Sequence, residues 1–150
     1  DDEEHKLVMV LATTNCPWDV DDALRRRLEK RIYIPLPDQQ SRLEMLKLYL
    51  GTVHAQNDLD YETLASKLDG YSGADIRIVC RDAAMMPMRR MVLNKTPQQL
   101  IDLRNEGKLK SLDSGISMQD LMLALHKTQP SVTPATIQRY VNWESEFGST

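Results

Sequence analysis

Residues 70–90 read GYSGADIRIVCRDAAMMPMRR and contain the strongest folding signal in the chain. Ser72, with Asp75 three residues later, has the pattern of a capping box, which opens a helix. The apolar residues that follow recur at helical spacing, namely Ile76, Val79, Cys80, Ala83, Ala84, Met88 and Met91. Pro87 removes a backbone donor and collides with the preceding turn, so we expect the helix to kink or end there.

Further helices are predicted on both sides of this stretch. Their expected starts are Asp38, Asp60, Thr96, Ser117 and the pair Thr133-Pro134. These residue types accept hydrogen bonds from the free N–H groups of a first helical turn, and proline is tolerated there. Gly70 is placed to end the helix before the capping box. The polar, glycine-containing residues 105–115 are expected to form a loop.

The start of the chain has a different pattern. Residues 6–13 (KLVMVLAT) form an apolar run typical of a strand buried on both faces, and residues 31–36 (RIYIPL) are a second β-rich run. Two strands do not make a stable sheet alone, so we expect them to pair with further sequence or another chain. We therefore predict a mainly α chain: residues 1–37 end an α/β sheet domain, residues 38–130 form a helical domain, and residues 131–150 form a C-terminal helix.

Composition excludes several classes of protein. A hydrophobic fraction of 41% with 27% charged residues is that of a soluble globular protein, and no apolar run approaches the roughly 20 residues that span a bilayer. The net charge of -3 argues against a dedicated nucleic-acid binder. Cys16 and Cys80 have no metal or redox spacing and are expected to be reduced, buried thiols. We expect neither nucleic acid, membrane nor bound metal.

Three groups of residues could carry chemistry. Asn15 follows the first apolar run, where parallel sheets bind ligands, although asparagine also simply forms turns. Residues 24–31 (LRRRLEKR) hold three adjacent arginines, which suit phosphate but could form a solvated turn paired with nearby aspartates. Residues 70–76 present backbone donors at a helix start, where a phosphate can bind, or form an ordinary capped turn. Taken singly, each pattern favours the second interpretation.

Together, the motifs strongly resemble the meiotic clade of AAA ATPases, which includes katanin, spastin, fidgetin and the ATPase that disassembles ESCRT-III. The resemblance rests on the strand ending in asparagine and on four segments in order: DDALRRRLEKRIYIPLPD (21–38), GYSGADI (70–76), CRDAAMMPMRR (80–90) and NWESEFG (142–148). Katanin fits best, because residues 80–90 and TPQQLIDLRNEGKL (96–109) look like the corresponding katanin segments.

The resemblance implies a role for five residues. Asn15 falls at sensor 1, which helps to position the attacking water near the γ-phosphate. Arg26 and Arg27 match the two arginine fingers that reach the neighbouring subunit's nucleotide. Gly73 and Ala74 match the sensor-2 turn that lines the adenosine pocket. These roles come from the family and not from the local sequence.

It also implies the properties of a whole enzyme. These are ATP as the cofactor, with Mg²⁺ bound elsewhere in the enzyme, a hexamer, tubulin as substrate, a regulatory subunit bound through another region, and a cytoplasmic, cytoskeleton-associated location. Arg25 is the less suitable finger. The 150 residues contain neither a Walker A loop nor a Walker B acidic pair, so we expect the chain alone to be inactive.

Three other functions remain open. The first is an ESCRT-III-disassembling ATPase, although the short segment between Arg90 and Ser117 leaves little room for the β-structured insertion expected there. The second is a non-catalytic helical interaction module. The third, a DNA-binding helical domain of an AAA initiator, is disfavoured by the acidic net charge.

Overall fold

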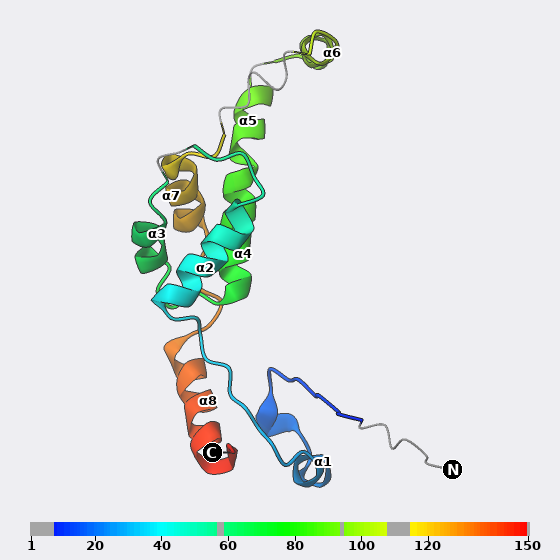
Figure 1. Ribbon diagram of the computed structural model, residues 1–150, viewed down its shortest axis with the longest axis vertical. Coiled ribbons are helices and arrows are strands. Elements are labelled where there is room, and N and C mark those ends of the chain that lie inside the picture. The colour runs from blue at the N-terminus through cyan, green and yellow to red at the C-terminus, as the bar shows by residue number, and fades with distance from the viewer. Residues whose placement is uncertain (1–7, 57–58, 94, 108–114, 150) are drawn as a thin grey trace, which may run out of the picture. The chain divides into compact units, whose positions relative to one another are not determined.

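The computed structural model describes residues 8–56, 59–93, 95–107 and 115–149. The chain forms two compact units (Figure 1). Pro35–Pro134 make up one, called the helical unit here, and Asp1–Ile34 with Ala135–Thr150 make up the other, called the terminal unit. The described residues are mainly helical, which confirms the predicted fold class.

The helical unit is built around one central helix. Its described helices are α2 (Gln39–Leu50), α3 (Tyr61–Lys67), α4 (Gly73–Ala84), α5 (Met86–Val92), α6 (Pro97–Asn105) and α7 (Met118–Lys127). Helix α4 packs against α2 and α7, and α2 packs also against α3. In Figure 1, α6 lies beyond the far end of α5, away from this bundle. The fully buried side chains of the bundle are Leu46, Leu50, Leu64, Leu68, Ile76, Val79, Ile116 and Leu121.

Side-chain caps begin these helices where the sequence predicts them. Five caps accept a hydrogen bond from the backbone N–H three residues later, at 2.7–3.3 Å, and they are Asp38, Asp60, Ser72, Thr96 and Ser117. The last three complete capping boxes. Gly70 has the positive φ of 79° that a helix C-terminus commonly requires. The predicted break is also confirmed, because α4 ends at Ala84 and Pro87 lies in the first turn of α5.

A buried arginine joins the start of α2 to α3. Arg42 donates from Nε to the carbonyl of Ala65 at 2.8 Å and from Nη1 to the carbonyl of Pro37 at 2.9 Å. Its Nη1 also lies 3.0 Å from Asp69 Oδ1. A buried charge is tolerated only when it is paired and hydrogen-bonded in this way. No pattern in the sequence distinguishes this arginine from an exposed one.

The two predicted strands are not formed. The described residues 8–13 and 31–36 contain no strand, whereas Lys6 and Leu7 lie outside the described residues. From Val8 to Leu11 the side chains are 75–87% exposed, and Ile32 and Ile34 are as exposed. The apolar pattern is present, but a strand needs a neighbouring strand for its hydrogen bonds, and none of the described residues provides one.

The terminal unit contains a 3-10 turn, η1 (Pro17–Asp19), the short helix α1 (Asp22–Arg27) and α8 (Pro134–Phe147), whose first residue belongs to the helical unit. The single helical turn expected over residues 19–27 is therefore two elements. Asp21 separates them, because its side chain accepts from Leu24 N at 2.9 Å and caps α1.

The two thiols differ from expectation. Cys80 is buried in the core, and burial raises the pKa of its thiol to about 11. Cys16 is exposed, so the expectation that both thiols are buried is wrong. Cys16 follows the unpaired apolar run, which leaves it without the cover that a sheet would give.

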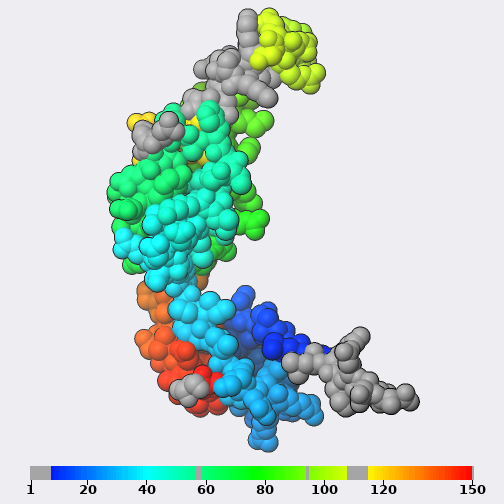
Figure 2. Space-filling model, in the orientation of Figure 1, coloured from blue at the N-terminus to red at the C-terminus, as the bar shows by residue number. Residues whose placement is uncertain are grey.

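The bundle provides a direct stability test. Leu64 is fully buried, whereas Leu48, on the outer face that α2 and α3 form in Figure 2, is 70% exposed. Leu64→Ala is expected to lower the free energy of unfolding by about 2–5 kcal/mol, because it removes apolar contacts and leaves a cavity. The matched Leu48→Ala change should cost less than about 0.5 kcal/mol. Urea unfolding followed by circular dichroism measures both, and equal losses would contradict this core assignment.

Candidate functional site

The three adjacent arginines of α1 are not equivalent. Arg25 forms an ion pair with Asp22, and its guanidinium carbon lies 4.3 Å from the centre of the Phe147 ring. A guanidinium over an aromatic face is attracted by the ring's negative π surface. Arg25 is therefore engaged within its own unit.

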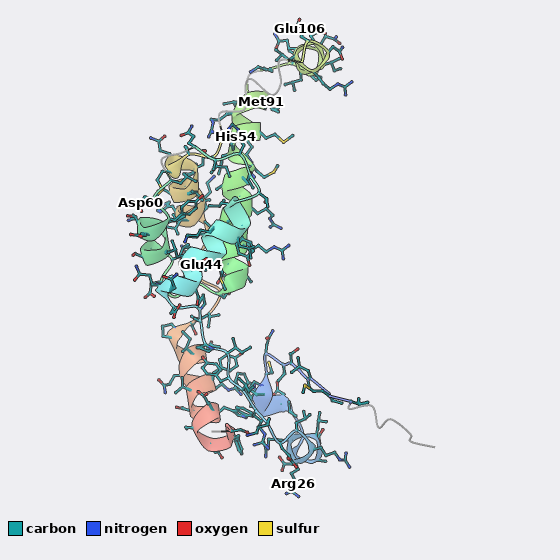
Figure 3. The ribbon with its side chains drawn as sticks, viewed as in Figure 1. Arg26, Glu44, His54, Asp60, Met91 and Glu106 are labelled. Carbon is teal, nitrogen blue, oxygen red and sulfur yellow. The ribbon has the colours of Figure 1, made fainter. Side chains whose placement is uncertain are left out.

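Arg26 and Arg27 are exposed in the last turn of α1. Within the described part of the chain, neither side chain has a hydrogen bond, ion pair or ring contact. Figure 3 shows Arg26 at the outer edge of α1. Two cationic side chains with no internal partner are free to bind an anionic group from outside the unit, such as phosphate.

Arg31 binds the ends of two helices. Its Nη2 donates to the carbonyl of Arg25 at 2.8 Å, and its Nη1 donates to the carbonyl of Phe147 at 2.7 Å. These carbonyls lie in the last turns of α1 and α8, where helical carbonyls lack intrahelical partners and the helix dipole favours a cation. Its Nε is buried with no partner among the described residues.

The aromatic face of α8 packs on the N-terminal segment of the terminal unit, as expected from its spacing. The Tyr140 ring lies 5.0 Å from Trp18 and 5.9 Å from Tyr33, centre to centre, and its hydroxyl donates to the carbonyl of Asn15. Arg139 lies over Trp18, with its guanidinium carbon 3.6 Å from the ring centre. The backbone of Asn15 is thus held by α8, while its side chain is exposed.

In the helical unit, Gly73 and Ala74 are the first two residues of α4. Ala74 is exposed and Gly73 is half-buried. As first-turn residues they have no intrahelical acceptor, and no other described hydrogen bond uses their N–H groups. A side chain at position 73 would meet only Met45 Cε and Sδ, at 3.5 and 3.7 Å, which is ordinary contact. The turn therefore offers an open backbone at a helix start.

A buried carboxylate fixes this turn. Asp75 Oδ2 accepts from the backbone N and Oγ of Ser72 at 3.0 and 2.8 Å, and from the backbone N and Oγ of Ser131 at 3.1 and 2.9 Å. The Tyr71 hydroxyl donates to the Thr128 carbonyl at 2.7 Å. Burial raises the pKa of Asp75, but the hydrogen bonds from the two serines outweigh it and hold that pKa below its usual value.

The structure divides the predicted site residues between the two units. Asn15, Arg26 and Arg27 belong to the terminal unit, and Gly73 and Ala74 belong to the helical unit. Their catalytic and nucleotide-binding roles stay predictions. Sequence reasoning missed Arg31, although it lies in the basic run that drew attention to α1, because an arginine that binds carbonyls looks the same as a solvated one.

Within the described ranges, no group of histidine, cysteine, aspartate or glutamate side chains could hold a metal ion. No described helix is both long and apolar enough to span a membrane.

Two family models match the chain. Residues 58–102 match the AAA+ lid domain, and residues 99–148 match the Vps4 C terminal oligomerisation domain. The bundle that carries the capped turn is thus the lid region of an AAA+ protein.

Known proteins narrow this class. Over 148 residues, or 99% of its length, the chain is 49% identical to the ATPase-containing katanin p60 A-like 1 protein of Danio rerio and to the protein of that name of Homo sapiens. It spans 30% and 29% of those relatives. The FIGL-1 AAA domain in complex with ADP superposes with a TM-score of 0.74 at 32% identity, covering 91% of this chain and 44% of that one.

A structure titled "Structural Basis for Katanin Self-Assembly" gives a TM-score of 0.73 at 33% identity, covering 87% of this chain and 44% of that one. The chain belongs to the katanin-like AAA ATPases. The resemblance predicted from its motifs is confirmed.

The Asp75 network predicts a specific pH dependence of stability. Because the folded pKa is lowered, the stabilisation is fully present above the unfolded pKa of about 3.9 and is lost as the pH falls through the folded pKa. Asp75→Asn removes the charge and should cost about 1–3 kcal/mol at pH 7.

Urea unfolding between pH 3 and 7 should show a flatter acid limb for Asp75→Asn than for the unsubstituted chain. Asp60→Asn is the matched control, because Asp60 caps α3 from an exposed position and asparagine caps a helix about as well. An acid limb parallel to that of the unsubstituted chain would refute the role of the Asp75 charge.

Proposed function

We propose that this chain supplies the nucleotide lid and the trans-acting arginines of a microtubule-severing AAA ATPase. The observation that carries the proposal is the contrast within one basic segment. Arg25 and Arg31 are bound inside the terminal unit, whereas Arg26 and Arg27 have no partner in the described residues. A chain that satisfies the flanking arginines and leaves this pair exposed fits a function in which the pair acts on a neighbouring molecule.

The proposed chemistry is electrostatic. During phosphoryl transfer, charge is spread over the transferred oxygens, and an arginine from a neighbouring subunit stabilises it. Guanidinium groups suit this role because they remain charged and donate two parallel hydrogen bonds. We assign this role to Arg26 and Arg27, and the positioning of the attacking water as sensor 1 to Asn15.

The lid role falls to the helical unit. Gly73 and Ala74 offer unpaired N–H groups and no bulky side chain at the start of α4, which fits close approach of an adenosine. ATP would supply the transferable phosphoryl group, with Mg²⁺ held by residues outside this chain, which has no Walker A or Walker B motif. The chain alone is therefore assigned no ATP turnover.

The whole-enzyme properties form part of the same proposal. Residues 1–37 would end the large α/β domain, residues 38–130 would form the lid, and residues 131–150 would supply the C-terminal helix of a hexamer. Tubulin is the proposed substrate, a regulatory subunit binds through another region, and the location is cytoplasmic and cytoskeletal. The similarity to katanin relatives and the oligomerisation-domain match support these assignments.

The match of residues 99–148 to a Vps4 model favours a second candidate, an ATPase that disassembles ESCRT-III. Against it, the described residues between α5 and α7 hold the helix α6 and no strand of a β-structured insertion. Stimulation of the full-length enzyme's ATPase by microtubules, but not by ESCRT-III polymers, distinguishes the two. The opposite response would favour the second candidate.

Loss of the exposed pair is expected to affect rate rather than affinity. In the full-length enzyme, Arg26→Ala/Arg27→Ala should leave ATP binding largely intact and lower hydrolysis roughly 10³-fold or more, because fingers act on transition-state charge. The control is Lys30→Ala, an exposed cation in the same segment, which should be nearly neutral. In mixed hexamers a normal neighbour should restore hydrolysis in the mutant's own pocket. A defect confined to the mutated subunit's own pocket would refute action in trans.

The contacts of α8 predict a role in assembly. Tyr140 packs against Trp18 and Tyr33, so removal of α8 uncovers the N-terminal segment of the terminal unit. Full-length enzyme truncated after Thr133 should keep a folded lid, measured by cooperative melting, but fail to form ATP-dependent hexamers. Analytical ultracentrifugation with a slowly hydrolysed ATP analogue measures this, and normal hexamers would exclude the role.

A further inference from the structure

The helix that bears the exposed arginine pair cannot hold itself in place. Helix α1 has six residues, and none of them is buried. Isolated helices this short are unstable in water, and α1 has no buried face through which a core could hold it. Its N-terminus is capped by Asp21, so whatever fixes its C-terminal end also fixes Arg26 and Arg27.

That end is held by the residues that close α8. Arg25 lies over the Phe147 ring, and the Arg31 guanidinium joins the Arg25 carbonyl to the Phe147 carbonyl. Ser149 adds a backbone-level attachment. Its Oγ accepts from Arg31 N at 3.0 Å and donates to the Glu29 carbonyl at 2.9 Å, and its N–H donates to the Arg31 carbonyl at 3.2 Å.

We propose that Phe147 and Ser149 are positioning residues for the arginine pair. The inference rests on the proposed function of Arg26 and Arg27 as trans-acting fingers. The two attachments lie on either side of the pair, at Arg25 before it and at residues 29–31 after it. The backbone between them is therefore fixed at both ends, and the two arginine side chains extend from a defined base.

Such a base matters for the chemistry. A catalytic group displaced by about 1 Å can lose roughly 10²-fold in rate, and each long arginine side chain already loses rotamer freedom when it reaches a phosphate. Additional freedom of the α1 backbone would spread the guanidinium positions further. The cost falls on the neighbouring subunit's hydrolysis and not on the affinity of either subunit for ATP.

The test uses two kinds of full-length subunit in mixed hexamers. Acceptors carry Arg26→Ala/Arg27→Ala and keep an active nucleotide pocket. Donors keep both arginines but have an inactivated pocket. Hydrolysis then comes only from acceptor pockets that adjoin a donor. Ser149→Ala is placed first in the donors and then, separately, in the acceptors, and turnover is normalised to assembled hexamer measured by ultracentrifugation.

We expect Ser149→Ala in donors to lower kcat by roughly 10-fold, up to about 10²-fold, with KM for ATP unchanged. The same change in acceptors should have little effect, because their fingers are already absent. A merely structural role would lower turnover equally in both placements. Phe147→Ala should show the same asymmetry, with Phe147→Tyr retaining the ring and Ser149→Thr retaining the hydroxyl as rescuing variants.

Ser145→Ala is the matched control, since the Ser145 hydroxyl donates only to Asn142 within α8. Equal effects of Ser149→Ala in donors and acceptors, or none in donors, would overturn the inference while leaving the fingers intact. Failure of unsubstituted donors to activate acceptors would instead overturn the finger assignment, and this inference with it.

Discussion

The carboxylate of Asp75 is the interaction on which the arrangement of the helical unit depends. One oxygen accepts hydrogen bonds from Ser72 and from Ser131, so it caps the central helix α4 and fastens the segment that follows α7 to the same point. A charged acceptor with several donors is stronger than a neutral one, and it is costly to lose in a buried place. The open turn at Gly73 is therefore part of a rigid element.

Local patterns predicted the helices well, because their signals lie within a few residues of each other. Asp38, Ser72 and Ser117 begin helices through bonds to residues three positions later, and Pro87 interrupts one by its own geometry. The strand predictions failed for the complementary reason. The residues from Val8 to Leu11 have the right composition, but a strand is defined by its partner, which the pattern cannot supply.

The candidate site was predictable only in part for similar reasons. The family resemblance identified Arg26 and Arg27, and the structure adds why they differ from Arg25 and Arg31: the flanking pair has partners in α8. Those partners are more than 100 positions away in the sequence, as in the bond between Arg31 and Ser149. No local rule connects residues at such separations, so the attachment of α1 could be seen only in three dimensions.

The exposed apolar run has a practical consequence for work with the isolated chain. Four consecutive side chains from Val8 to Leu11 face solvent, beside backbone groups that no described residue pairs. Segments of this kind template intermolecular β-pairing and aggregation. Particle size measured on the isolated polypeptide therefore reports adhesion between these segments as well as ordered assembly, and dispersing additives or a charged substitution within the run would separate the two.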